Sequence, residues 1–168
     1  MKKFLLILSI LFTSFMYCQD NNDTIVWEAS KKLTWDDFQE SSDPNHQGAA
    51  KTSYQIRIIP EEVSLDIDDN ILDYDAMTVQ TEFNKDRSWS TVKYDSIVLQ
   101  HEQLHFDIAE LFARKIRKKI LENKVVNKIT YDTFWADYKK LWKECTTLQR
   151  KFDTETNHGR NFEQNKLW

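Results

Sequence analysis

Cysteine, glycine and proline are scarce in this chain of 168 residues, which has two of each. One of the cysteines, Cys18, lies at the end of an N-terminal apolar segment. A chain that has lost this segment keeps Cys145 alone, which excludes an internal disulfide. An exported protein without disulfides is compatible with many bacterial envelopes. No second apolar run is long enough for a transmembrane helix, and we see neither an internal repeat nor a low-complexity segment.

The first 18 residues have the pattern of a secretory signal peptide. Lys2 and Lys3 precede an apolar stretch that is too short to span a bilayer. We therefore expect cleavage near Cys18, a single domain over residues 19–168, and a periplasmic, cell-surface or secreted location. In an alternative interpretation Cys18 is acylated and anchors the protein to a membrane, although the three residues before it are bulkier than in most lipoprotein signals.

Positive charge is not in excess. When Lys2 and Lys3 are removed from the 23 basic side chains, 21 stand against 27 acidic ones, and the net charge is −6. The basic residues between positions 114 and 119 are best explained as the solvated side of a helix. We therefore expect no nucleic-acid partner.

The first half of the mature chain is predicted to form strands. Apolar and polar residues alternate over residues 54–58, 63–67 and 77–83, which is typical of an antiparallel sheet with one buried face. Residues 68–70 are expected to form a turn, and residues 41–48 a loop.

The second half is predicted to form two long helices. The first runs from about residue 96 to about residue 122, with Asp95 or Ser96 as its N-cap. The second begins near Thr130, and its apolar residues are spaced by three and four, which places them on one core-facing stripe. Cys145 lies within this stripe and is expected to be a buried, inert thiol.

An HExxH motif, His101-Glu102-Gln103-Leu104-His105, lies on the first of these helices. Four residues separate the two histidines, so on a helix they project from one face and can bind one zinc ion. Glu102 is then placed to take a proton from a water on that ion. The competing interpretation is a pair of hydrogen-bonded histidines on a helix flank without any metal.

The rest of the helix does not supply a third ligand in an obvious way. Leu111 stands where one known pattern would place a third histidine, which excludes that pattern. Asp107 and Glu110 lie roughly 240° and 180° around the helix from His101. We therefore interpret both carboxylates as groups that steady the helix or a neighbouring histidine.

The predicted third ligand is His158. If the second helix packs antiparallel to the first, its C-terminal end returns towards the motif, and Gly159 permits the sharp backbone path that such a ligand needs. Glu144 or Asp137 on the second helix is the competing source of a ligand. His46 is expected to be an exposed residue of a polar loop.

Several segments resemble the DUF922 family, a bacterial family of predicted secreted zinc-dependent proteases. The similarity is carried by residues 33–38, Ser88-Trp89, the extended block at residues 101–110, and the terminal pattern Asp153-x-x-Thr156-x-His158-Gly159. The resemblance implies a zinc site and a protease activity. It agrees with the choice of the terminal histidine as a ligand.

We expect an α+β, zincin-like fold, in which a small antiparallel sheet packs on the motif helix and a second long helix lies behind it. The expected function is zinc-dependent peptide-bond hydrolysis, with Zn²⁺ as the cofactor and a peptide or protein as the substrate. His101, His105 and His158 are the predicted metal ligands, and Glu102 is the predicted general base. Tyr94 and Arg160 are candidates for stabilising the oxyanion.

Two other functions remain open at this stage. One is a non-catalytic envelope protein whose zinc site is structural, which the small size of the chain favours and the presence of Glu102 disfavours. The other is a zinc hydrolase that cleaves a non-peptide amide, such as cell-wall material. A fourth zinc position occupied by water would support hydrolysis, whereas a fourth protein ligand would support a structural site.

Overall fold

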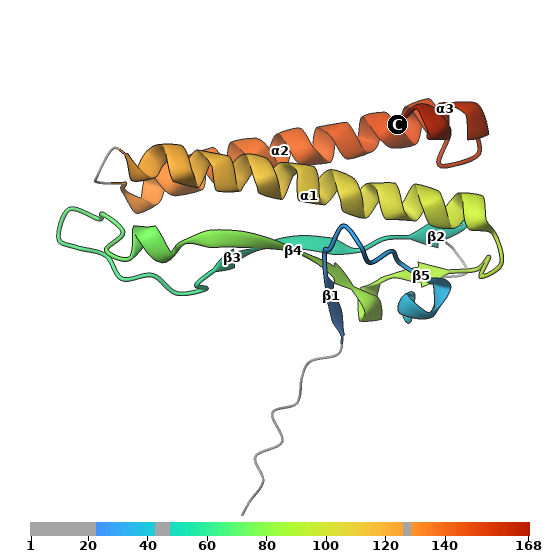
Figure 1. Ribbon diagram of the computed structural model, residues 1–168, viewed down its shortest axis with the longest axis horizontal. Coiled ribbons are helices and arrows are strands. Elements are labelled where there is room, and N and C mark those ends of the chain that lie inside the picture. The colour runs from blue at the N-terminus through green and yellow to red at the C-terminus, as the bar shows by residue number, and fades with distance from the viewer. Residues whose placement is uncertain (1–22, 43–47, 126–128) are drawn as a thin grey trace, which may run out of the picture.

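A computed structural model describes residues 23–42, 48–125 and 129–168. The chain forms two layers, with a small antiparallel sheet below and two long helices on one of its faces (Figure 1). The α+β class and the small antiparallel sheet are therefore as predicted. The elements, in chain order, are β1 (Thr24–Val26), a 3₁₀ turn (Trp35–Asp37), β2 (Ala50–Lys51), β3 (Tyr54–Ile59), a 3₁₀ turn (Tyr74–Ala76), β4 (Thr78–Asn84), a 3₁₀ turn (Lys85–Arg87), β5 (Trp89–Ser90), α1 (Ser96–Lys124), α2 (Tyr131–Thr156) and α3 (Phe162–Leu167).

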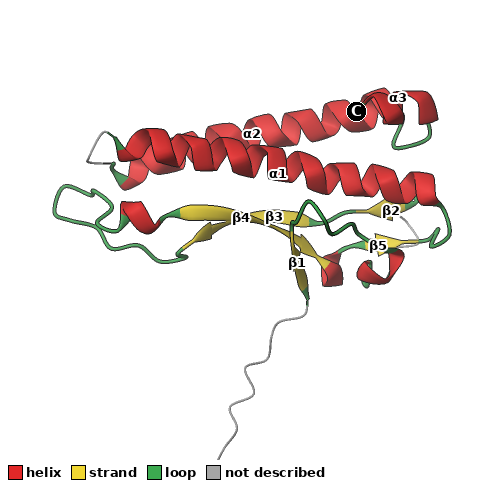
Figure 2. Ribbon diagram, in the orientation of Figure 1, coloured by secondary structure: helices red, strands yellow, loops and turns green. Residues whose placement is uncertain are grey.

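Three strands form the main sheet in the order β1-β4-β3, and both neighbouring pairs are antiparallel. Ile56 pairs with Thr81 and Ile58 with Val79, so the predicted alternation places one row of side chains under the helices. A second, two-stranded sheet pairs β2 with β5. Figure 2 shows both sheets on the same side of the helical layer.

The strand predicted at residues 63–67 is wrong. This segment is a loop, in which Leu65 forms one isolated bridge with Ile71, and Ile67 is 99% exposed. The carboxylate of Asp66 accepts hydrogen bonds from the backbone N–H of Asp68 and of Asn70, both at 2.9 Å. Because these side-chain bonds compete with a strand ladder, the segment turns back on itself instead of extending.

Helix α1 begins where the sequence predicts. The Asp95 side chain caps it by accepting hydrogen bonds from the backbone N–H of Ile97 and Val98. One face of α1 packs on the sheet through a row of buried apolar side chains at helical spacing: Ile108, Phe112, Ile116 and Ile120. This packing fixes the rotation of the helix about its own axis, and hence the direction in which its other side chains point.

Glu110 faces the sheet and lies on the side of α1 away from the motif histidines. Its carboxylate accepts hydrogen bonds from Thr81 on β4 at 2.9 Å, from Arg114 at 3.0 Å and from Arg117 at 2.6 Å. Glu110 is therefore neither a ligand nor a partner of a motif histidine. It attaches α1 to the central strand of the sheet.

Gln103 and Asp107 hold the N-terminal segment against α1. The Gln103 side-chain oxygen accepts a hydrogen bond from the backbone N–H of Leu33 at 2.8 Å. The Asp107 carboxylate accepts from the Trp27 indole at 2.7 Å and from the Gln103 amide at 2.8 Å. Asp107 thus steadies the fold, as expected, but through the N-terminal segment and not through a histidine.

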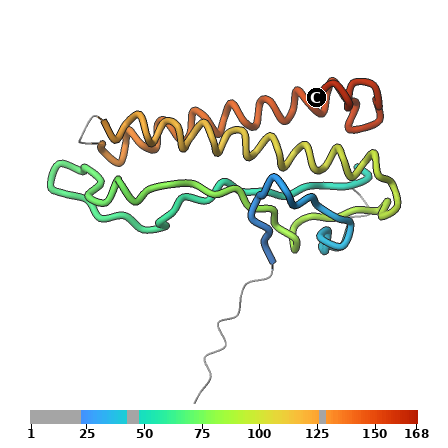
Figure 3. Tube along the Cα trace, viewed as in Figure 1, coloured from blue at the N-terminus to red at the C-terminus, as the bar shows by residue number. Residues whose placement is uncertain are grey.

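Helix α2 runs antiparallel to α1, packs against it, and reaches strand β3 of the sheet. Thr130 caps it, and Tyr138 donates a hydrogen bond to the backbone oxygen of Ile56 on β3 at 2.8 Å. Cys145 is fully buried in the predicted stripe. The C-terminal end of α2, together with α3, lies at the end of the molecule where α1 begins (Figure 3). None of the described helices combines the length and the apolar character needed to cross a membrane.

Candidate metal centre

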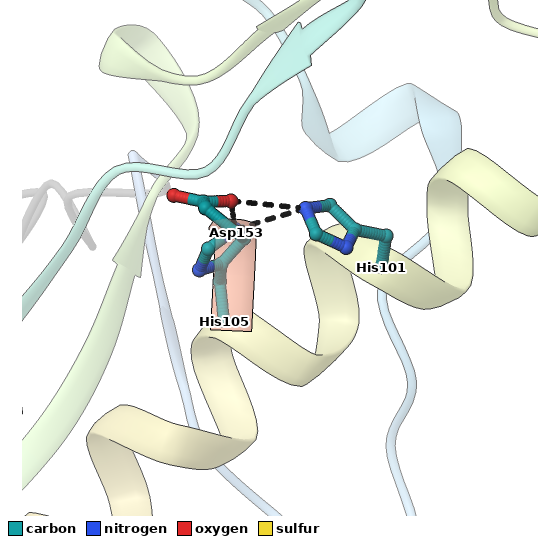
Figure 4. A group of neighbouring side chains, drawn as sticks. All are labelled: His101, His105 and Asp153. Atoms are coloured by element: carbon teal, nitrogen blue, oxygen red, sulfur yellow. Dashed lines mark hydrogen bonds and ion pairs between the residues drawn. The ribbon is translucent and has the colours of Figure 1, made fainter. Parts of the chain in front are cut away.

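His101 and His105 point towards one residue of α2, Asp153 (Figure 4). The two Nε2 atoms are 3.1 Å apart. The Asp153 Oδ1 atom lies 3.3 Å from Nε2 of His101 and 3.0 Å from Nε2 of His105. Two imidazoles from one helix and a carboxylate from a helix far along the chain therefore converge on one point.

These separations fit a metal ion. Zinc binds imidazole nitrogen and carboxylate oxygen at about 2.0–2.1 Å, and its tetrahedral sites then have neighbouring ligand atoms roughly 3.3 Å apart. The three observed distances, 3.1, 3.3 and 3.0 Å, lie close to that value. The donor set of two imidazoles and one carboxylate is also a known zinc set.

Neighbouring side chains set the protonation of both rings in a way that favours a metal. The Gln149 amide nitrogen donates to the backbone oxygen of His105 at 2.8 Å, so the Gln149 oxygen is left to accept a hydrogen bond from Nδ1 of His105. Nδ1 of His101 similarly lies 3.1 Å from the side-chain oxygen of Asn165. With the proton of each ring on Nδ1, the two Nε2 atoms can each offer a lone pair to a metal ion at the common point.

Charge and burial act together in this group. Burial would raise the pKa of Asp153, but its hydrogen bonds to the two histidines and their charges hold that pKa well below its usual range. Burial would lower the pKa of His105, yet the hydrogen bond with Asp153 and the negative charge of Glu102 raise it overall. The site therefore attracts positive charge, whether from a proton or from a metal ion.

Tight packing fixes the ring of His101. Phe152 stacks on it with ring centroids 4.4 Å apart and an angle of 23° between the planes. Gly159 has a φ of +78° and also packs against this side chain, so that an added Cβ would lie 3.0 Å from Cγ of His101. The glycine is thus required both by its backbone conformation and by the close approach.

Gly159→Ala should therefore destabilise the protein and disturb the centre. We expect the free energy of unfolding to fall by about 1–3 kcal/mol, since the alanine strains the backbone and pushes on the His101 ring. Urea unfolding with a chelator present measures the first effect, and zinc affinity measures the second. Arg160→Ala, at the exposed next residue, serves as the control. An alanine variant with the stability and zinc affinity of the parent would show that His101 is free to shift.

Glu102 lies beside this group and is 5% exposed. Its backbone oxygen accepts a hydrogen bond from the Thr52 hydroxyl at 3.2 Å, which places the segment between β2 and β3 next to the motif. Among the described residues its carboxylate has no hydrogen bond and no ion pair. Its negative charge acts on the neighbouring His105, whose pKa it helps to raise.

Asp153, not His158, completes the converging group. The ring of His158 is 72% exposed, and its Nδ1 lies 3.5 Å from Oδ1 of Asp153. His158 therefore lies at the rim of the group, close to the predicted place but outside the set of converging ligand atoms. His46 belongs to residues 43–47, which lie outside the described part of the chain.

The carboxylates that competed for the role of ligand lie elsewhere on α2. Asp137 is 3.7 Å from the Lys119 ammonium and accepts a hydrogen bond from Asn123. Asp137 and the exposed Glu144 line a groove of about 350 Å³ beside several lysines of α1, well along that helix from the motif. Neither is placed to bind an ion held by the two histidines.

The sequence does contain an indication that Asp153 faces the motif. Cys145, Gln149 and Asp153 follow one another at intervals of four residues, so they share the face of α2 that carries the buried stripe. A carboxylate at the end of a buried row is a better ligand candidate than one on the solvated side. The antiparallel packing of the helices then brings that row to the motif.

The comparisons with known proteins identify a family and nothing more specific. The model of DUF922, described as a bacterial protein of unknown function, matches residues 30–159. No curated protein and no solved structure matches the chain.

Proposed function

We propose that this chain, which belongs to the DUF922 family, is a zinc-dependent hydrolase that cleaves peptide bonds outside the cytoplasm. The observation that carries the proposal is the group formed by His101, His105 and Asp153, whose three ligand atoms lie 3.0–3.3 Å apart. The location rests on the signal-like pattern of the first 18 residues, which lie outside the described part of the chain.

His101, His105 and Asp153 would hold the zinc. Zinc at such a site lowers the pKa of a coordinated water to about 7 and polarises a carbonyl group. Gln149 and Asn165 accept hydrogen bonds from the two Nδ1 atoms and so orient the imidazoles, which is the usual task of groups behind metal ligands. A motif helix that packs on a small antiparallel sheet is also compatible with a zincin-like architecture.

Glu102 is the general base of this proposal. It takes a proton from the attacking water as the oxygen of that water bonds to the carbonyl carbon, and the electron pair of the carbonyl moves to its oxygen. Glu102 then gives the proton to the nitrogen of the leaving amine as the carbon–nitrogen bond breaks. Its position on α1 directly after His101, with a side chain that is mostly buried, suits a group that acts on a water held beside the histidines.

A peptide is the substrate that the surroundings favour. Thr52 bonds to the backbone of Glu102, so the short sheet of β2 and β5 lies next to the motif. An extended peptide that runs beside such a strand gains main-chain hydrogen bonds.

The rival proposal, a structural zinc site, needs four protein ligands. In the described part of the chain, His101, His105 and Asp153 are the three groups that converge. Three ligands leave one position for a water, which supports hydrolysis over a structural role.

Metal analysis and a cleavage assay test the proposal together. The protein, purified without chelators, should contain about one zinc per chain. It should also cleave fluorescently labelled casein, lose this activity after zinc is removed with a chelator, and regain it when zinc is added back. Cleavage of peptidoglycan but not casein would move the substrate to a cell-wall amide. A chain that neither contains zinc nor takes it up would end both zinc proposals.

A further inference from the structure

The ligands of the candidate centre are not equally accessible. The side chains of His101 and His105 are 4% and 14% exposed, whereas that of Asp153 is 29% exposed. A molecule from solvent therefore reaches the group from the side of Asp153. The ring of His158, which is 72% exposed, lies on that side.

The Nδ1 atom of His158 faces the centre but forms no short hydrogen bond with it. Its Nδ1 lies 3.5 Å from Oδ1 of Asp153, which is long for a hydrogen bond. The ring forms no other hydrogen bond or ion pair within the described residues. The imidazole thus has a donor available for a molecule that approaches the centre.

The backbone turn that ends α2 holds this ring in place. Asn157 and His158 have positive φ values of 49° and 53°, a conformation in which many helices end and which asparagine and histidine adopt more readily than most residues. The turn is well fixed, because the backbone N–H of His158 donates to the oxygen of Asp153 at 2.8 Å and that of Asn161 to the oxygen of Thr156 at 2.8 Å. The ring of His158 therefore keeps its place next to Asp153.

We infer that His158 is a catalytic residue which donates a hydrogen bond from Nδ1 to the carbonyl oxygen of the substrate as negative charge builds up on it. The inference rests on the proposed function and specifies how that site stabilises its transition state. As the water oxygen bonds to the carbonyl carbon, the electron pair of the carbonyl moves to its oxygen, and His158 stabilises this charge without transferring a proton.

The other candidates for this role are less well placed. Tyr94 is 87% exposed on the loop before α1, and Arg160 is exposed at the end of the turn that contains His158. Neither side chain forms a hydrogen bond or an ion pair with His101, His105 or Asp153 within the described part of the chain. Of the three, His158 is the one that comes within 4 Å of a charged atom of the centre in the described part of the chain, Oδ1 of Asp153.

A substitution of His158 separates this role from that of a ligand. His158→Asn is the suitable variant, because asparagine tolerates a positive φ and its side chain is shorter. Zinc affinity, measured by chelator competition, should stay within about twofold of the parent, because the three ligands are untouched. The kcat for labelled casein should fall roughly 10²- to 10³-fold, as when one oxyanion donor is lost, with little change in KM.

A second measurement does not depend on turnover. Benzylphosphonate carries oxygens that mimic the charged reacting oxygen, so it should bind the zinc-loaded parent roughly ten- to a hundredfold more tightly than the zinc-loaded His158→Asn variant. Arg150→Ala, at an exposed position near the C-terminal end of α2, is the control and should behave like the parent in both measurements.

Several outcomes would overturn the inference. A tenfold or larger loss of zinc affinity in His158→Asn would make His158 a ligand. Equal kcat or equal phosphonate affinity in the two proteins, or no phosphonate binding to the parent, would remove its catalytic role while leaving the zinc centre intact. A parent that does not bind zinc at all would remove the proposed function, and this inference with it.

Discussion

Glu102→Gln should abolish hydrolysis and leave the zinc content unchanged. Glutamine keeps the shape of the side chain but cannot accept a proton from the attacking water. A positioned general base contributes about 10²- to 10⁴-fold to the rate, so the kcat for labelled casein should fall by that factor. The three proposed ligands are not altered, and zinc stoichiometry should stay near that of the parent.

The matched control is Glu122→Gln, which removes the same charge from an exposed position near the other end of α1. It should leave kcat, KM and zinc content as they are in the parent. Far-ultraviolet circular dichroism checks that both variants are folded. If Glu102→Gln cleaved casein at the parental rate, the base would have to be sought elsewhere.

Asp153→Ala should cause the largest loss of zinc affinity among substitutions on α2. It removes one of three proposed ligands, and the remaining two imidazoles come from α1 alone. The affinity should fall by more than the roughly 10- to 100-fold that the loss of a group behind a ligand costs. Chelator competition measures it directly. The gain in melting temperature on adding zinc should shrink as well, because a ligand stabilises only the folded state that binds it.

Glu144→Ala is the control on the same helix. Glu144 is exposed in the groove beside the lysines of α1 and was a candidate ligand on sequence grounds alone. Its removal should leave zinc affinity unchanged. If the two variants bound zinc equally well, Asp153 would not be a ligand. The third ligand would then have to be another residue, with His158 as the first to test.

The parts of this fold that the sequence predicts are those in which local chemistry and long-range packing agree. Asp95 caps α1 and Thr130 caps α2, and in both helices the apolar period of three to four residues coincides with the buried side. The alternation over β3 and β4 agrees equally well with their pairing. Each element could therefore be predicted without knowledge of its neighbours.

The loop at residues 61–72 could not be predicted in the same way. Its alternating apolar residues favour a strand, but Asp66 offers the backbone another set of hydrogen-bond partners. Which set wins depends on whether a neighbouring strand is available, and alternation says nothing about that. The exposed Ile67 shows that the pattern carried no buried face.

The choice of the third proposed ligand could not be made from the sequence for a different reason. The antiparallel return of α2 was expected, and it brings the chain near Asp153 and His158 to the motif. Choosing between two residues five positions apart requires the exact phase of α2 against α1, which depends on packing between Phe152 and the His101 ring. A statistical preference for histidine over carboxylate cannot supply that phase. The helical angles of Asp107 and Glu110 excluded them as ligands, but their partners on other segments became evident only in the folded chain.

Because cysteine is scarce, the candidate centre would also have a structural effect when it holds a metal ion. Cys145 is the one cysteine in the described part of the chain and is buried, so no covalent bond ties α1 to α2 there. His105 and Asp153 are 48 positions apart in the sequence. An ion bound by both would act as a reversible cross-link, or clasp, between the N-terminal part of α1 and the C-terminal end of α2.

Such a clasp differs from a disulfide because its strength follows the supply of free metal. The stabilisation grows by about 1.4 kcal/mol for each tenfold rise in free zinc once the site is nearly saturated. Where the metal is scarce, the C-terminal part of α2 would open more often and become accessible to other proteases. The abundance of this protein, and not only its activity, would then report on how much zinc its compartment contains.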